Sequence, residues 1–366
     1  MKLYKRHLII GAWLLAFLLA MGSAGCERTA RSKTLSVDEP TVMTVTLVGD
    51  LGLGLAVESY PWIKKNGYDA AFEHVRPHMK GADYFVANLE TPIVDPEMET
   101  VFGERRPRHD RAVAAVLKKE GVGIVGLANN HLMDYGEAGL KTTIRYLDEA
   151  GIRHFGAGVN LEEARRPLIL EKDGFKTAIV AGCRPRKWRL LATAKLPGVA
   201  PVTEPRWGRD IREAKKQADF VIAYPHWGAC YHPKVKDSQR QFAAIAVNAG
   251  ADIVVGHHPH IPQKVEMQKG VPVLYSIGNF VYHGVRKKGR DRTLKYDYSW
   301  IAKIEITRKG LKSVTIIPFF NNNMRVDFTP RPAKVEKARW LYNRLLPPDS
   351  WQFEDSVAVL RLMKKD

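Results

Sequence analysis

The chain has 366 residues, enough for one large domain or two ordinary ones with a sizeable buried core. With 45% hydrophobic and 26% charged residues, its composition is that of a globular protein and excludes disorder over the whole length. The formal net charge of +18 predicts an acidic partner (nucleic acid, anionic lipid or a polyanion) or, as the alternative, a well-solvated basic surface.

The N-terminus has the layout of an export signal. A basic start precedes an apolar run from Leu8 to Met21, and small residues lead to Cys26. The run of roughly 14 residues is shorter than the ~20 that span a bilayer, which favours a cleaved signal over an uncleaved anchor. Ala24-Gly25-Cys26 resembles the end of a bacterial lipoprotein signal, in which the cysteine is acylated, although Ser23 stands where a larger aliphatic residue is usual.

From this N-terminus we expect residues 1–26 to be a lipoprotein signal with lipidation at Cys26. The polar stretch 27–40 would then tether the folded body to the extracytoplasmic face of the cell membrane. That location makes nucleic acid a poor candidate partner.

Strand-like and helix-like stretches alternate from Thr41 onward. Alternating apolar residues predict a strand from Met43 to Leu47, and apolar residues at helical spacing follow at Phe72, Val75 and Met79. Further strands are predicted at 84–87, 123–127, 177–181, 220–224, 253–255, 271–275, 301–306 and 314–318, with helices between most of them. This alternation predicts an α/β domain over residues 41–330, followed by a helical C-terminal extension over 331–366.

Polar side chains follow five of these strands. Because the carboxyl ends of parallel strands open onto one edge of a sheet, the loops that follow them are expected to meet. Each side chain alone has a structural explanation as a turn residue, a helix cap or a buried histidine. Their conjunction favours a divalent metal site, since imidazole and carboxylate together suit zinc, manganese or iron. The residues are Asp50, Asn88 with Glu90, Asn129 to His131 with Asp134, His226, and His257 to His260.

The order of the motifs resembles the CapA family of poly-gamma-glutamate capsule biosynthesis proteins. The resemblance covers about residues 44–318 and is carried by Gly49-Asp50, Asn88-Leu89-Glu90-Thr91-Pro92, Asn129-Asn130-His131 through Asp134-Tyr135-Gly136, His226-Trp227-Gly228, Gly256-His257-His258-Pro259-His260 and Ser276-Ile277-Gly278-Asn279-Phe280. It implies the calcineurin-like metallophosphatase fold, a β-sandwich flanked by helices in αββα order.

The resemblance also implies roles for individual residues. The implied metal ligands are Asp50, Glu90, Asn130, His226, His258 and His260, with His257 competing with His258 for the inner position. His131 with Asp134 would be catalytic, and Asn88, Asn129, His257 and Asn279 would contact substrate. Two positions depart from the pattern: Gly52 replaces a histidine common in metallophosphatases, and Cys230 replaces a glutamate usual in the family.

Three functions remain open on the sequence alone. The first is an accessory role in synthesis, export or anchoring of an anionic surface polymer such as poly-gamma-glutamate, with capsule synthesis and export membrane proteins as partners. Basic clusters at 184–189 and 286–292 would attract such a polyanion. The second is metal-dependent hydrolysis of a phosphorylated substrate, with His131 as general acid. The third is a binding scaffold with a degenerate site.

Cys230 and Cys183 both follow predicted strands. Cys230 is predicted to be an apolar filler, a thiolate ligand of the metal, or half of a disulfide with Cys183.

Overall fold

The computed structural model describes residues 42–54, 61–104, 106–184, 190–282, 297–321, 326, 328–348 and 351–361. Residues 40–366 form one unit. None of the described helices is long and apolar enough to cross a membrane.

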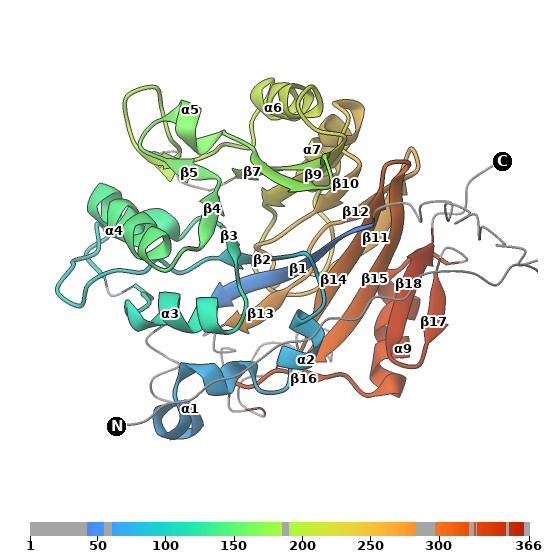
Figure 1. Cartoon of the computed structure of the whole chain (residues 1–366), viewed down its shortest axis with the longest axis horizontal. Coiled ribbons are helices and arrows are strands. Elements are labelled where there is room, and N and C mark those ends of the chain that lie inside the picture. The colour runs from blue at the N-terminus through green and yellow to red at the C-terminus, as the bar shows by residue number, and fades with distance from the viewer. Residues whose placement is uncertain are drawn as a thin grey trace, which may run out of the picture. The chain divides into compact units, whose positions relative to one another are not determined.

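Two mixed β-sheets form the body (Figure 1). Ten described strands form the larger sheet: β17 (Gln352–Glu354), β18 (Val357–Arg361), β15 (Gly310–Phe320), β14 (Tyr298–Thr307), β1 (Met43–Gly52), β2 (Tyr84–Leu89), β3 (Ile124–Gly126) and β4 (Arg153–Phe155) in that order, with β13 (Asn279–Tyr282) on β1 and β16 (Arg331–Pro332) on β15. Six form the second: β11 (Val265–Gln268), β12 (Val271–Leu274), β10 (Ile253–Val255), β9 (Phe220–His226), β7 (Phe175–Cys183) and β6 (Leu168–Lys172). A short pair joins β5 (Ala157–Gly158) to β8 (Gly198–Val199).

Successive side chains of the strands alternate between the two faces of a sheet, and this alternation explains the sandwich. In β7 and β9, Ile179 and Ile222 belong to the same buried cluster as Val45 and Leu47 of β1, whereas Val180 and Val221 point the other way. The first set therefore fills the space between the sheets, and the second contacts helices outside them.

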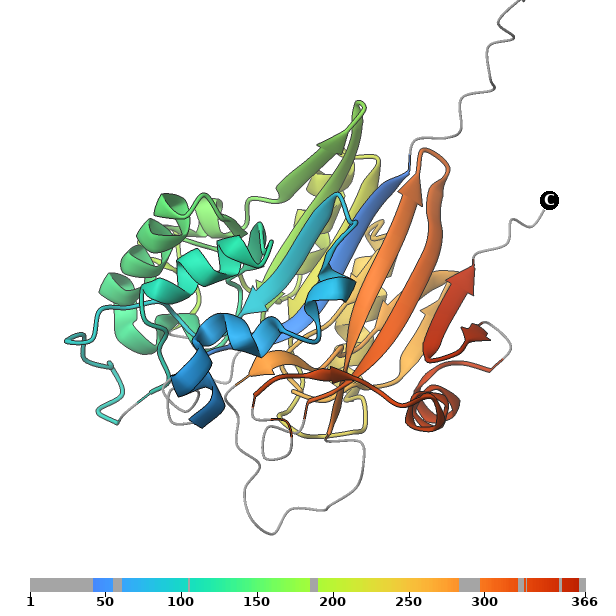
Figure 2. The same ribbon diagram turned by 60° about the horizontal axis from the view of Figure 1, so that its bottom comes forward.

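Helices cover the outer faces (Figures 1 and 2). Trp207 and Phe242 pack α6 and α7 on the smaller sheet, and Tyr342 attaches α9 to β15 by donating its hydroxyl to Ile316 O at 3.0 Å. The described helices are α1 (Pro61–Asn66), α2 (Arg76–Met79), α3 (Ala112–Lys119), α4 (Gly136–Glu149), α5 (Leu161–Ala164), α6 (Arg206–Lys215), α7 (Asp237–Asn248) and α9 (Val335–Leu345), with 3-10 turns η2 (Tyr68–Phe72) and η3 (Leu132–Tyr135).

The predicted α/β sandwich flanked by helices is confirmed. Two local predictions were incomplete. The apolar stripe from Phe72 to Met79 is split between η2 and α2. The C-terminal segment, predicted to be a helical extension, contains α9 but also gives β16, β17 and β18 to the larger sheet, because their edges pair with β15 and with each other.

Candidate metal centre

The strand register brings the predicted polar residues together. Asp50 in β1 lies opposite both Asn88 in β2 and Asn279 in β13. In the second sheet, His226 ends β9 and forms a bridge to His257 just after β10. The carboxyl ends of the parallel strands in the two sheets therefore meet at one edge, as the sequence predicted.

Asp50 is fully buried and has three polar contacts. Its Oδ1 accepts a hydrogen bond from Asn88 Nδ2 at 2.7 Å, and its Oδ2 lies 3.2 Å from His260 Nδ1 and 3.3 Å from the His258 backbone N–H. Burial opposes ionisation, but the hydrogen bond and the charge of His260 hold the pKa of Asp50 well below its usual range. Asp50 is thus a permanent anion.

Glu90 lies beside it with both carboxylate oxygens buried and without a hydrogen-bond partner among the described residues. The nearest basic atoms are His226 Nε2 at 3.5 Å and His260 Nδ1 at 3.7 Å. Burial and the neighbouring charge of Asp50 raise the pKa of Glu90 to about 8. A buried carboxylate without donors, flanked by imidazole nitrogens, is the arrangement that a cation satisfies.

Asn130, His226 and His258 form the adjacent side of the centre. His226 Nε2 lies 2.6 Å from Asn130 Oδ1 and 3.0 Å from His258 Nδ1, and His258 Nδ1 lies 3.1 Å from Asn130 Oδ1. Burial lowers the pKa of His226 to about 3 and that of His258 well below its usual value. Both rings are neutral at pH 7, the form that ligates metals.

These donors fall into three overlapping groups. Within each group the ligand atoms lie within 4.8 Å of one another: Asp50, Glu90 and His260; Glu90, His226 and His258; and Cys230, His258 and His260. Glu90 is common to the first two, so it stands where a carboxylate would bridge two ions. The mixed nitrogen and oxygen donors fit zinc, manganese or iron.

His131 and Asp134 lie next to the centre. The ring Nδ1 of His131 is 2.7 Å from Asp134 Oδ2. Burial works against protonation, but the hydrogen bond to Asp134 and the charge of Glu90 raise the pKa of His131. The pair therefore favours the protonated imidazole beside the cluster.

Of the predicted substrate-binding residues, two contact the donor cluster and one contacts the loop backbone. Asn279 Oδ1 lies 2.9 Å from His260 Nδ1, and Asn88 contacts Asp50 and His226, so both position the cluster. Asn129 Nδ2 donates to Leu89 O, and its Oδ1 accepts from the backbone N–H groups of His131 and Leu132. These hydrogen bonds use the side chain to stabilise the loop.

His257 is fully buried. The centroid of its ring lies 4.1 Å from that of Tyr224, and burial lowers its pKa to about 4. His258, and not His257, lies with His226 and Asn130, which separates two histidines that the sequence left equivalent.

Backbone constraints stabilise the histidine turn, the segment Gly256–His260. His258 and His260 have positive φ angles of 93° and 59°, which non-glycine residues adopt at a cost. Gly256 precedes them because a Cβ there would lie 2.2 Å from the carbonyl oxygen of Tyr275.

Two tyrosines near the centre were missed by sequence reasoning. The rings of Tyr282 and Tyr231 lie 4.7 Å and 5.3 Å from that of His260. Neither belongs to a motif of polar strand ends, so only the packing of β13 and of the loop after β9 reveals them.

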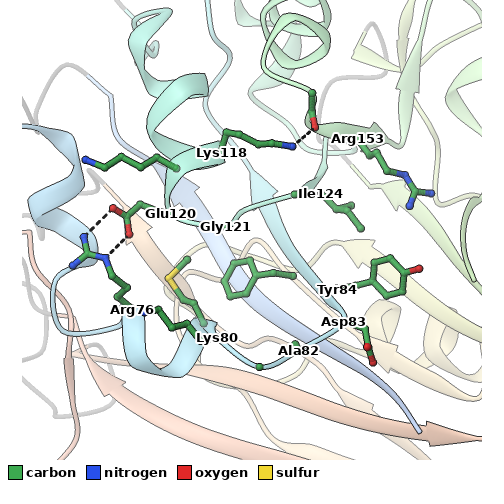
Figure 3. Close-up of a pocket in the computed structure, with 16 residues that line it drawn as sticks. Arg76, Lys80, Ala82, Asp83, Tyr84, Lys118, Glu120, Gly121, Ile124 and Arg153 are labelled. Atoms are coloured by element: carbon green, nitrogen blue, oxygen red, sulfur yellow. Dashed lines mark hydrogen bonds and ion pairs between the residues drawn. The ribbon is translucent and has the colours of Figure 1, made fainter. Parts of the chain in front are cut away.

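A separate cavity of about 860 Å³ lies at the opposite, amino-terminal ends of β2, β3 and β4 (Figure 3). Five basic side chains and two acidic ones line it. Arg76 forms a forked ion pair with Glu120, and Lys118 Nζ donates to Gly151 O at 2.8 Å. The remaining lining cations are Lys80, Lys119 and Arg153.

Several predicted features lie outside the described residues. They are the signal with Cys26, the tether, and most of the basic clusters at 184–189 and 286–292.

Comparisons with known proteins agree with the motifs. The family model "Bacterial capsule synthesis protein PGA_cap" matches residues 44–283. The PGA biosynthesis protein CapA of Bacillus subtilis is 30% identical over 372 residues, which cover 100% of this chain and 94% of that protein. The capsule biosynthesis protein CapA of Bacillus anthracis is 31% identical, with 100% and 88% covered. Among solved structures, the NAD nucleotidase NadN of Haemophilus influenzae aligns with 84% of this chain and 57% of its own, at 15% identity and a TM-score of 0.44.

Proposed function

Since the chain belongs to the PGA_cap family of bacterial capsule synthesis proteins, we propose that it acts in synthesis, export or anchoring of an anionic surface polymer such as poly-gamma-glutamate. The observation that carries the proposal is similarity over the whole chain to two proteins named for capsule biosynthesis. The ordered donor cluster at the sheet edge supports a working site in this chain and argues against a degenerate scaffold.

The residues that would hold a divalent ion are Asp50, Glu90, Asn130, His226, His258 and His260. A bound ion would polarise a substrate oxygen and lower the pKa of bound water toward ~7. Elemental analysis of the purified protein tests this part of the proposal. We expect a stoichiometric transition metal or zinc, and a protein that holds none after incubation with these ions would contradict it.

The basic surface supports a polyanionic partner. The net charge of +18 gives long-range attraction, and the cavity at the amino-terminal strand ends presents an excess of cations. Among the described residues, Arg76 and Lys119 form ion pairs, whereas Lys118 and Arg153 donate to backbone carbonyl oxygens. Lys80 has neither kind of partner among them, so it is available to a carboxylate of the polymer.

A salt series of poly-gamma-glutamate binding tests the electrostatic part. We expect the double variant Lys80→Gln/Lys118→Gln to bind more weakly and with a shallower salt dependence. The matched control Lys195→Gln/Lys264→Gln removes two exposed charges outside the cavity and should change both much less. Binding that ignores salt, or equal effects of the two variants, would contradict a specific role for the cavity.

One observation favours hydrolysis as a second candidate function. The His131–Asp134 pair favours a protonated imidazole next to the donor cluster, a group that could protonate a leaving oxygen. The metal-loaded protein should then hydrolyse a generic phosphomonoester or phosphodiester, and Asp50→Ala should abolish the turnover. Stoichiometric metal without turnover on either substrate would exclude this candidate.

The N-terminal sequence supports a place on the extracytoplasmic face of the cell membrane, with Cys26 as lipid anchor. Membrane proteins of capsule synthesis and export would be neighbours there.

A further inference from the structure

We propose that Cys230 is a thiolate ligand of the metal centre, and that with His258 and His260 it makes this centre prefer a thiophilic divalent cation of the zinc class. The inference rests on the metal centre of the proposed function. It goes beyond that function because it adds a donor and names the class of ion.

The first observation is the position of the thiol. Cys230 Sγ lies 3.5 Å from His258 Nε2, and the sulfur and one nitrogen each of His258 and His260 lie within 4.8 Å of one another. The two nitrogens of His258 face different partners, because Nδ1 contacts His226 and Asn130. The thiol therefore belongs to the same cluster of donor atoms as the two histidines.

The second observation is the incomplete donor set of the neighbouring group. His260 also belongs to the group of Asp50 and Glu90, and both oxygens of Glu90 are buried without a hydrogen-bond partner among the described residues. That group offers three donors, one fewer than the tetrahedral set that zinc usually takes. Cys230 shares a group with His260, so it offers an additional donor to that set.

The two loops are joined where the thiol meets the histidines. The backbone N–H of Tyr231 donates to Pro259 O at 2.8 Å, between His258 and His260. Tyr231 itself has a positive φ of 55°. This hydrogen bond keeps residue 230 beside the histidine turn, so the sulfur is held near its partners before any ion binds.

A thiolate changes which ions the centre takes. Soft sulfur donors select zinc over harder ions such as manganese, for which carboxylates and water suffice. Binding releases the thiol proton to solvent, so the thiolate offsets one of the two positive charges that the ion brings. Cys230 is exposed whereas Asp50 and Glu90 are buried, which puts the sulfur on the solvent side of the cluster.

The alternatives predicted for this cysteine fit the structure less well. An apolar filler would be buried, and Cys230 is exposed. A disulfide would join Cys230 to Cys183, but both are free thiols in the structure, and Cys183 is buried whereas Cys230 is exposed.

Cobalt(II) spectroscopy on the full-length protein tests the proposal. Cobalt occupies zinc sites, and a cobalt–thiolate bond gives an intense near-ultraviolet charge-transfer band that nitrogen and oxygen ligands do not give. We expect the band in the wild type and in the matched thiol variants Cys183→Ala and Cys26→Ser, and its loss in Cys230→Ser. Zinc affinity of Cys230→Ser should fall by at least about tenfold, the lower end of what losing even an outer partner of a ligand costs, with manganese affinity little changed.

Cys230→Asp is the control for a folding defect in Cys230→Ser. It keeps an anionic donor, so it should still bind cobalt but should not show the band. Stoichiometric cobalt binding without the band in the wild type would overturn thiolate ligation by Cys230. A band that persists in Cys230→Ser would overturn it too, and neither result would contradict the metal centre itself. Failure of the wild type to bind cobalt at all would overturn the metal centre and this inference together.

Discussion

Replacement of Glu90 by glutamine should have opposite effects on the stability of the metal-free and metal-bound protein. The metal-free fold holds this carboxyl group buried, without hydrogen-bond donors, and near the permanent charge of Asp50. Glutamine keeps the shape, removes the titratable charge and offers an amide donor to Asp50. We therefore expect Glu90→Gln to be more stable than the wild type when metal is chelated.

The magnitude follows from the pKa of Glu90, raised from 4.5 to about 8 by burial and by Asp50. The folded state binds a proton that the unfolded state releases between these values, so the wild type loses stability as pH rises through this window. Each pH unit above 4.5 adds about 1.4 kcal/mol, which gives roughly 3 kcal/mol at pH 7. Below pH 4.5 the advantage of the variant should disappear.

Metal reverses the order. An ion at about 1,000 times its dissociation constant stabilises the wild type by about 4.1 kcal/mol, which exceeds the variant's advantage of roughly 3 kcal/mol in chelator. Glu90→Gln should lose nearly all of this gain because it lacks the shared carboxylate. Urea unfolding from pH 4 to pH 8, with chelator and with zinc, measures both effects. The difference between the two proteins isolates Glu90, since they share all the histidines. A variant that is less stable in chelator at pH 7, or that gains as much from zinc as the wild type, would refute this account of the site.

Three further predictions concern other positions. Gly256→Ala should destabilise the fold by about 1–3 kcal/mol or more in urea unfolding, because its methyl group would lie 2.2 Å from a backbone carbonyl oxygen, whereas Gly123→Ala meets no atom within 4 Å and should be neutral or slightly stabilising. Asp134→Asn removes the partner that raises the pKa of His131, so the NMR titration of this ring should move to lower pH, and an unchanged midpoint would contradict the pairing. Cys26→Ser should leave the signal uncleaved and mislocalise the protein in fractionated cells, whereas unchanged retention with an intact N-terminus would favour a permanent anchor.

The sequence predicted the arrangement of the site better than its details. Polar residues at strand ends were enough to place Asp50 with Glu90 at one edge of the larger sheet and His226 at the corresponding edge of the smaller one, because parallel strands of one sheet end at the same edge. The packing of the two sheets brings these edges together. The roles of His257 and His258 could not be separated, since neighbouring residues in a turn have no fixed periodicity. The contact of 3.1 Å between His258 Nδ1 and Asn130 Oδ1 shows which ring faces Asn130.

The C-terminal part shows a second reason for incomplete prediction. A helix was correctly predicted beyond Pro330, and Leu341 and Tyr342 are buried on it, but the three residues of β17 are all exposed. It becomes a strand because β18 offers it a free edge, and β18 in turn pairs with β15. Pairing between distant segments of this kind is not encoded in local sequence.

The strand order of the larger sheet has a kinetic consequence. β1 is the first described strand of the chain, yet it pairs with β14, whose residues come some 250 positions later, so that Met43 meets Ile306. Contacts of such long sequence separation slow folding, because the loop between them must close before they form. A chain in transit, from the ribosome or through a membrane pore, exposes β1 without its antiparallel partner until residue 298 has emerged. The topology thus delays completion of the sheet until nearly the whole polypeptide is available, and a ribosome-arrested chain ending before β14 should remain sensitive to protease throughout.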